Sequence, residues 1–237
     1  MQDAADDGFN ASGAGFLAWC QRNVIPIRRK NLIHEIWILV GECPIEGFHS
    51  LALSAKAPGV TLNVQAFNDR DHAVDLLDSG AIDAAIGVPP THADSRILTR
   101  PLLQDEFVTI LASDHPEALR GMSIENYLAL PHVLVSPEGE LYGVVDQVLA
   151  QQGKKRKLGL TLPQMFAVPT IVAQTRMTAT VMKRVAHHSL VGNQLALFPP
   201  PVTLPEVVFD LIWHRRSDAN PAQRWFREFI AERAATL

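Results

Sequence analysis

Cysteine is scarce in this sequence, and its scarcity excludes two kinds of small domain. The 237 residues contain two cysteines, Cys20 and Cys43, which are too far apart to form a CxxC metal-binding pair. They also provide no disulfide framework of the kind that stabilises small secreted domains. The sequence therefore favours a reducing compartment, and we expect a cytoplasmic protein.

Long hydrophobic runs and an excess of positive charge are also missing. No apolar run approaches the ~18 residues that a membrane span requires. The first segment, MQDAADDGFN, is acidic and lacks the positive start of a secretory signal. The net charge is −4, whereas a domain that grips DNA through its phosphates is usually basic. We therefore expect no membrane association and no specific DNA binding by this chain alone.

Motifs typical of catalysis are absent as well. The sequence has no GxSxG elbow, no P-loop and no HExxH. His187 and His188 are adjacent, so on a helix they would point about 100° apart and would not share a metal ion. Ser136 and His132 are close in sequence, but no third group is evident to orient them. We predict a protein that is not an enzyme and needs neither metal nor cofactor.

What the sequence does contain is one stretch around which the chain is organised. Residues 78–90, DSGAIDAAIGVPP, combine a glycine-terminated helix with a short apolar strand at 84–88 that two prolines stop. Ligands in open α/β sheets bind beyond the carboxyl ends of strands. Gly87, Val88 and Pro89 are therefore candidate binding residues.

Strand and helix patterns alternate along the rest of the chain. We expect strands at 35–41, 60–67, 84–88, 107–112, 132–136, 157–162, 195–198 and 207–214. We expect helices at 45–56, 70–79, 124–129, 143–152, 165–173 and 182–189, and a last one that Asn220 caps. Residues 99–101 are expected to form an irregular link, and 180–182 are too short to assign.

This order predicts an α/β protein with two Rossmann-like lobes and a central cleft. The first lobe is expected to comprise residues 35–112 and about 200–237, and the second residues 113–199. Two crossovers then join the lobes, and hinges near them can open or close the cleft. Residues 1–34 are expected to form a partly disordered leader of unclear role.

Five stretches resemble a known family. They are APGV at 57–60, LLDSGAIDAAIGV at 76–88, PLLQDEFVTILASDHP at 101–116, PHVLVSPEGELYGVVD at 131–146 and IWHRRSDANPAQRWFREFI at 212–230. In this order the sequence resembles the effector-binding domain of LysR-type transcriptional regulators, in the branch of nodulation and aromatic-degradation regulators. The resemblance covers about residues 35–237 and implies the fold of type II periplasmic binding proteins.

The sequence departs from that family in two places. Residues 1–34 are too short for the winged helix-turn-helix and linker helix that begin a full member. The usual T-V-P-x-R reads Thr180-Val-Met-Lys-Arg184 here, a change expected to alter only a local turn. We therefore expect DNA contact only through a domain that is not in this chain.

Loops at strand ends supply the candidate ligand-binding residues, and by resemblance the matching family positions line the effector cleft. The candidates are Cys43, Pro44, Gly87, Val88, Pro89, Ser136, Tyr142, Gln164, Phe166, Val168, Pro169 and Phe198.

Each side chain among these candidates also has a structural interpretation. Ser136 offers a hydroxyl and nearby amides that suit a carboxylate or a phenol, but a serine here can equally cap the strand. The segment from Gln164 enters a helix, where unpaired amides favour an anion. Tyr142, Phe166 and Phe198 offer aromatic walls, for which ordinary packing is the alternative. Trp213 and Trp225 are expected in the core.

The resemblance implies a domain that senses a small aromatic or carboxylate effector. The alternatives are a transport-type solute-binding protein and an enzyme on the same two-lobed fold, which fold alone does not separate. The apolar stripes of helices 45–56 and 143–152 are wider than one sheet face requires. Together with the resemblance, they predict a homodimer.

Overall fold

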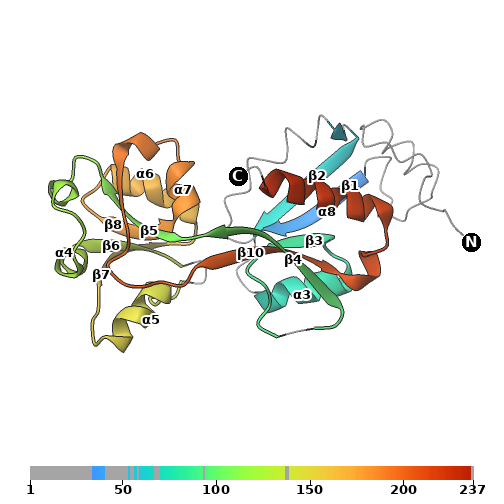
Figure 1. Ribbon diagram of the computed structural model, residues 1–237, viewed down its shortest axis with the longest axis horizontal. Helices are drawn as coiled ribbons and strands as arrows, with labels where there is room; N and C mark the ends of the chain where they lie inside the picture. Colours follow the sequence, from blue (N-terminus) through green and yellow to red (C-terminus); the bar gives the residue numbers. More distant parts are fainter. Residues whose placement is uncertain are drawn as a thin grey trace, which may run out of the picture. The chain divides into compact units, whose positions relative to one another are not determined.

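The computed structural model describes residues 34–40, 53, 56–57, 59–66, 70–92, 94–136 and 139–235. The chain divides into two compact units, unit 1 with Met1–Leu103 and Phe209–Leu237, and unit 2 with Gln104–Val208. Each unit contains one five-stranded mixed sheet flanked by helices (Figure 1). The predicted α/β fold of two Rossmann-like lobes is confirmed.

Unit 1 is built on a sheet with the strand order β2-β1-β3-β10-β4. β1 is parallel to β2 and β3, and β10 is antiparallel to β3. Figure 1 shows α3 and α8 on opposite faces of this sheet. The elements are β1 (His34–Val40), β2 (Val60–Ala66), α3 (Arg70–Ser79), β3 (Ala84–Gly87), β4 (Ile97–Asp105), β10 (Val207–His214) and α8 (Pro221–Ala234).

The helices of unit 1 begin and end where the sequence signals predict. Gly80 follows α3 with φ +71°, a left-handed conformation that glycine adopts without strain. Asn220 caps α8 through its side chain, which accepts hydrogen bonds from the amides of Ala222 and Gln223 at 3.0 and 3.1 Å. Both helix termini are thus fixed by local chemistry.

Unit 2 has the strand order β7-β6-β8-β5-β9, with β6 parallel to β7 and β8 and with β5 antiparallel to β8 and β9. Its strands are β5 (Phe107–Ala112), β6 (Pro131–Val135), β7 (Lys157–Leu162), β8 (Thr178–Met182) and β9 (Leu195–Phe198). Its helices are α4 (Ile124–Ala129), α5 (Val144–Gln151), α6 (Val168–Ala173) and α7 (Lys183–His187). Short 3-10 turns are η1 (Pro116–Leu119), η2 (Met165–Ala167) and η3 (Gly192–Gln194), and η4 (Arg215–Ser217) belongs to unit 1.

Three segments differ from the sequence-based expectations. Residues 99–101 lie inside β4 rather than in an irregular link, because β4 is the edge strand of its sheet and an edge strand tolerates Pro101. Residues 180–182 belong to β8, which lies between β6 and β5. The strand 107–112 belongs to unit 2, since it pairs with β8 and β9, so the units change at 103/104 and 208/209 rather than near 112 and 200.

The apolar stripe of α5 packs against other residues of unit 2. Val145 and Leu149 are buried with Tyr127 and Val202, and Val144 and Val148 pack against the same cluster. The width of this stripe therefore does not require a partner chain, which removes one argument for a homodimer. The predicted helix 45–56 lies outside the described residues except for Leu53 and Lys56, both helical. The predicted leader 1–34 lies outside them except for His34.

Candidate functional site

One edge of the unit 2 sheet brings together loops from four strands. β6, β7 and β8 are parallel, so they all end at this edge. β9 runs in the same direction as β8, because both are antiparallel to β5, and it ends there with Phe198 opposite Thr109. The predicted residues Ser136, Gln164 and Phe198 therefore follow or end strands at one edge of one sheet.

Ser136 follows β6 directly and is 9% exposed. Its amide donates to the carbonyl of Leu162 at 2.8 Å, and its own carbonyl accepts from Gly139 at 3.2 Å. Gly139 has φ +80°, so the chain turns sharply after the strand. The Ser136 amide is thus already occupied, so the hydroxyl of this residue is the group that remains for a ligand.

The loop between β6 and α5 presents apolar surface at the same edge. Leu141 is 69% exposed and Tyr142 is 52% exposed. The next residue, Gly143, donates its amide to Asp146 Oδ2 at 2.9 Å, which fixes the first turn of α5. Tyr142 therefore stands on an anchored helix start and is not packed as a core residue.

The segment after β7 contributes side chains of two kinds. Gln164 and Phe166 are exposed, Phe166 by 42%. Val168 and Pro169 are buried in the start of α6, so their side chains serve the core of unit 2. Of this predicted group, only Gln164 and Phe166 offer side chains to a ligand at the surface.

At the corresponding edge of unit 1, β1, β2 and β3 end together, because they are parallel. Gly87 is buried, and Val88 and Pro89 are half-buried. Asp210 of β10 pairs with Gly87 across the strands and is 5% exposed. The predicted residues Cys43 and Pro44 lie outside the described residues.

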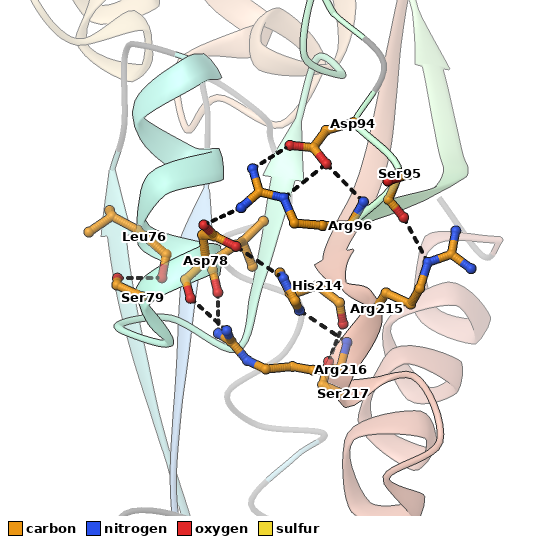
Figure 2. A network of polar contacts seen from close by, with 11 residues as sticks. Leu76, Asp78, Ser79, Asp94, Ser95, Arg96, His214, Arg215, Arg216 and Ser217 are labelled. Carbon is orange, nitrogen blue, oxygen red and sulfur yellow. Dashed lines mark hydrogen bonds and ion pairs between the residues drawn. The ribbon is translucent and has the colours of Figure 1, made fainter.

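An ion-pair network at the end of α3 and β10 joins three segments of unit 1 (Figure 2). Asp78 accepts from Arg96 at 2.5 Å and contacts His214 Nε2 at 3.1 Å. Arg216 donates to the carbonyl oxygens of Asp78 and Leu77 and so satisfies the end of α3. Sequence reasoning missed this network, although four of its residues lie in two of the motifs that carry the family resemblance.

Residues of the WH…W-x-R motif are structural, but of the two tryptophans expected in the core only Trp225 is buried, and Trp213 is half-buried. Trp213 Nε1 donates to Asp218 at 3.1 Å, and the Arg227 guanidinium lies 4.9 Å from the centre of the Trp213 ring. Arg227 also donates to the Asp218 carbonyl at 2.9 Å. Trp225 is buried and stacks on Phe229. The motif therefore ties the turn after β10 to α8.

A second polar network lies inside unit 2. Arg156 donates to both carboxylate oxygens of Asp146, at 2.9 and 2.7 Å. Burial raises the pKa of Asp146, but the hydrogen bonds from Arg156 and Gly143 outweigh burial and lower the pKa overall. The pair is bidentate and supports the α5 start beside Tyr142.

His132 and Tyr127 extend this polar interior. His132 is fully buried, its Nε2 lies 2.6 Å from the Tyr127 carbonyl, and its Nδ1 has no hydrogen-bond partner among the described residues. Burial lowers the pKa of His132 to about 4. The Tyr127 hydroxyl lies 2.8 Å from Thr180 Oγ1, and burial raises its pKa. His132 is thus a neutral core residue and not a partner for Ser136.

Chemically, these groups suit binding. Among the described residues, no group of three or more histidine, cysteine or acidic side chains is arranged to hold a metal ion. In the same part of the chain, no helix has the length and hydropathy of a membrane span. The strand-end edge of unit 2 combines hydroxyl, amide and aromatic side chains, which can orient a small organic molecule.

Comparison with known proteins identifies related sequences and structures. The family model described as the LysR substrate binding domain matches residues 51–235. The transcriptional activator NagR of Ralstonia sp is 31% identical over 181 residues, covering 76% of this chain and 60% of NagR. Nodulation protein D of Azorhizobium caulinodans is 23% identical over 177 residues, covering 74% of this chain and 56% of that protein. The chain therefore spans about three fifths of the length of these curated relatives.

Among solved structures, the regulatory domain of MexT, a transcriptional activator in Pseudomonas aeruginosa, matches with a TM-score of 0.70 and 27% identity. The match covers 84% of this chain and 97% of that domain. The family and branch indicated by the five sequence motifs are confirmed. This chain belongs to the LysR substrate-binding domain family.

Proposed function

We propose that this chain is the effector-sensing part of a transcriptional regulator and binds a small aromatic or carboxylate molecule through its strand-end loops. The observation that carries the proposal is the convergence of Ser136, Tyr142, Phe166 and Phe198 on loops or strand ends at one edge of the unit 2 sheet. A planar aromatic effector matches the exposed rings there, and a hydroxyl or carboxylate on it matches Ser136.

The relatives support a regulatory role rather than a catalytic or transport role. NagR is named as a transcriptional activator, and MexT as one whose regulatory domain has the same fold. We propose that DNA is contacted by a domain outside these 237 residues, which fits the net charge of −4. A regulator of this kind works beside DNA, so we propose a cytoplasmic location.

We also propose that the protein acts as a homodimer. A full-length regulator of the family, CbnR, has been solved in complex with its target DNA, with a TM-score of 0.61 to this chain and 15% identity, which shows the shared fold. Since the apolar side chains of α5 pack inside unit 2, we expect the dimer to form through a surface other than α5. Analytical ultracentrifugation tests this: a dimer at tens of micromolar is expected, and a monomer at that concentration would overturn the assembly.

A thermal-shift screen with aromatic acids, phenols and flavonoids tests the binding function. A specific ligand raises the melting temperature in proportion to the logarithm of its concentration over Kd, because it binds the folded state alone. A series in which no compound stabilises the chain at millimolar concentration would contradict the proposal.

Two substitutions at the unit 2 edge locate the site once a ligand is known. Ser136→Ala removes a hydroxyl and is expected to weaken binding about tenfold if that hydroxyl bonds the ligand. Ser123→Ala is the matched control, since Ser123 caps α4 by accepting from the Asn126 amide at 3.2 Å and precedes β6 instead of following it. Equal ligand affinity in Ser136→Ala and the unmodified chain would show that the site lies elsewhere.

A further inference from the structure

Three lysines lie at the junction between α5 and β7 of unit 2 (Figure 1). Lys154, Lys155 and Lys157 are exposed, whereas Arg156 between them has a side chain that is 2% exposed. Lys154 Nζ donates to an uncharged partner, Gln152 Oε1, at 3.1 Å. None of the ion pairs formed by the described residues includes any of the three lysines. Three positive charges therefore lie close together with no paired carboxylate in the described part of the chain.

Hydrogen bonds hold the backbone of this basic segment, residues 153–157. The Gly153 amide donates to the Ala150 carbonyl at 3.0 Å, and the Lys154 amide donates to the Leu149 carbonyl at 2.8 Å. With Gly153 at φ +66°, these two bonds form a Schellman motif that ends α5. The other end of the segment enters β7, which pairs with β6. The backbone that carries the lysines is therefore fixed at both ends.

Arg156 sets the direction in which its neighbours point. Its guanidinium donates to both carboxylate oxygens of Asp146 inside unit 2, at 2.9 and 2.7 Å. Successive side chains of an extended chain point to opposite sides, which agrees with a buried Arg156 between the exposed Lys155 and Lys157. The Cα atoms of these two lysines are at most roughly 7 Å apart. The segment therefore presents two neighbouring ammonium groups on its solvent side.

The remaining exposed cations of unit 2 are already paired. Each exposed lysine or arginine outside the basic segment forms an ion pair with a carboxylate: Arg120 with Glu117 at 3.2 Å, Arg176 with Asp114 at 3.4 Å and Lys183 with Glu106 at 2.6 Å. Unpaired positive charge in the described part of unit 2 is therefore concentrated on the basic segment. The net charge of −4 does not prevent contact with an anion there, because the local field decides such a contact.

The basic segment and the proposed effector site lie at opposite edges of the unit 2 sheet. Lys157 begins β7, whereas Ser136 and Gln164 follow parallel strands that end at the other edge. A strand of this length separates the two edges by roughly 17 Å. A partner on the basic segment therefore leaves the strand-end loops free for an effector.

The composition of the segment favours a phosphate backbone over an acidic protein surface. Protein interfaces contain apolar and aromatic residues at their centre and are depleted in lysine. The exposed residues from 151 to 157 are two glutamines, one glycine and the three lysines. Interfaces with DNA are more polar and much more positively charged, and lysine binds phosphate as a point charge. Duplex DNA is therefore the polyanion that this surface fits.

We infer that the basic segment binds the phosphate backbone of duplex DNA through Lys154, Lys155 and Lys157, without reading the base sequence. This contact rests on the proposed role of the chain in a transcriptional regulator. It adds to the contact proposed for a domain outside these 237 residues, and it revises the expectation that DNA is touched only there. Because that domain holds DNA nearby, a contact that is weak in isolation acts at a high effective concentration.

Titration of the 15N-labelled 237-residue chain with a mixed-sequence duplex of about 16 base pairs tests this contact. At about 20 mM salt, we expect the amides of residues 153–157 to shift. Neutralisation of two or three phosphates predicts that Kd rises about 20- to 80-fold between about 20 and 100 mM salt. A duplex of another sequence should bind with the same Kd. Poly-L-glutamate, whose charges are less dense than those of DNA, should bind more weakly.

Two triple variants with the same net charge assign the contact to the segment. The first carries Lys154→Gln, Lys155→Gln and Lys157→Gln, and we expect its Kd for DNA at about 20 mM salt to rise at least about tenfold. The control carries Arg120→Gln, Arg176→Gln and Lys183→Gln, which remove the three paired cations, and its Kd should stay within about threefold. Replacement of the three lysines by arginine should retain binding, and circular dichroism melting checks that all variants fold.

The outcomes separate this contact from the function on which it rests. Equal losses in the two glutamine variants, or DNA-induced shifts that spare residues 153–157, overturn the contact. Tighter binding of poly-L-glutamate than of DNA also overturns it and assigns an acidic protein as the partner. If the thermal-shift screen finds a ligand and DNA causes no shifts, only the contact fails. If DNA binds as expected and no ligand is found, only the proposed effector binding fails.

Discussion

Each unit fixes one helix end with a polar network around an Asp–Arg ion pair, and this pair is exposed in unit 1 but buried in unit 2. In unit 1, Asp78 and Arg96 meet at the surface, with side chains 38% and 54% exposed. In unit 2, Asp146 and Arg156 meet in the interior, with side chains 11% and 2% exposed. Both networks hold a helix end, α3 in unit 1 and α5 in unit 2. An Asp–Arg ion pair therefore contributes differently to the free energy of unfolding in the two units, because water screens the exposed pair of unit 1 and not the buried pair of unit 2.

The largest effect is expected where the buried pair is broken. Arg156→Met removes the guanidinium and leaves the Asp146 carboxylate buried, with the Gly143 amide as its one remaining hydrogen-bond partner among the described residues. Such a loss costs about 3–5 kcal/mol of unfolding free energy. Urea unfolding monitored by circular dichroism measures it. A loss below about 1 kcal/mol would show that the pair is screened like a surface pair.

A smaller effect is expected from acid, through His132. The pKa of His132 is about 4 in the folded chain against 6.5 when unfolded, so the unfolded state binds the proton first. The contribution of neutral His132 to the free energy of unfolding is therefore constant above pH 6.5, and it is lost as the pH falls from 6.5 to 4. One pKa unit corresponds to about 1.4 kcal/mol, which predicts a loss of about 2–3 kcal/mol at pH 4.5.

His132→Gln isolates this contribution, because glutamine does not titrate and its amide can still donate to the Tyr127 carbonyl. We expect the variant to lose about 2–3 kcal/mol less than the unmodified chain between pH 7.5 and 4.5, as measured by urea unfolding at each pH. Identical acid sensitivity in the two proteins would contradict the neutral, buried state of His132.

The smallest effect is expected at the exposed network. Arg96→Ala removes the ion pairs to Asp78 and Asp94, and exposed pairs of this kind contribute about 0–1 kcal/mol. The difference from the unmodified chain should shrink further in 0.5 M salt, where the screening length falls below ~5 Å. A loss as large as that of Arg156→Met would erase the contrast between the units.

The sequence predicted the architecture better than the connections between strands. Periodic stretches such as 107–112 and 124–129 match β5 and α4 in extent, because their apolar residues face a core. β4 was missed because a proline such as Pro101 usually interrupts a strand. A strand tolerates this proline here because β4 lies at the edge of its sheet. β8 was missed because five residues give too little periodicity, and its place between β6 and β5 depends on long-range pairing.

The candidate site was predictable only in part. Strand-end logic placed Ser136 and Phe198 correctly at one sheet edge, since that logic needs only the order of strands and loops. Arg156 was missed because a basic run reads as a solvated turn, although its side chain is 2% exposed.

The central claim is that the unit 2 strand ends hold the effector, and hydrogen exchange with the best thermal-shift ligand tests it most directly. With ligand bound, we expect amides in 139–143 and 164–168 to exchange at least tenfold more slowly. Amides of η1 and η3, which lie at the opposite edge of the same sheet, should be unchanged. Protection at η1 and η3 with none at 139–143 or 164–168 would contradict the account.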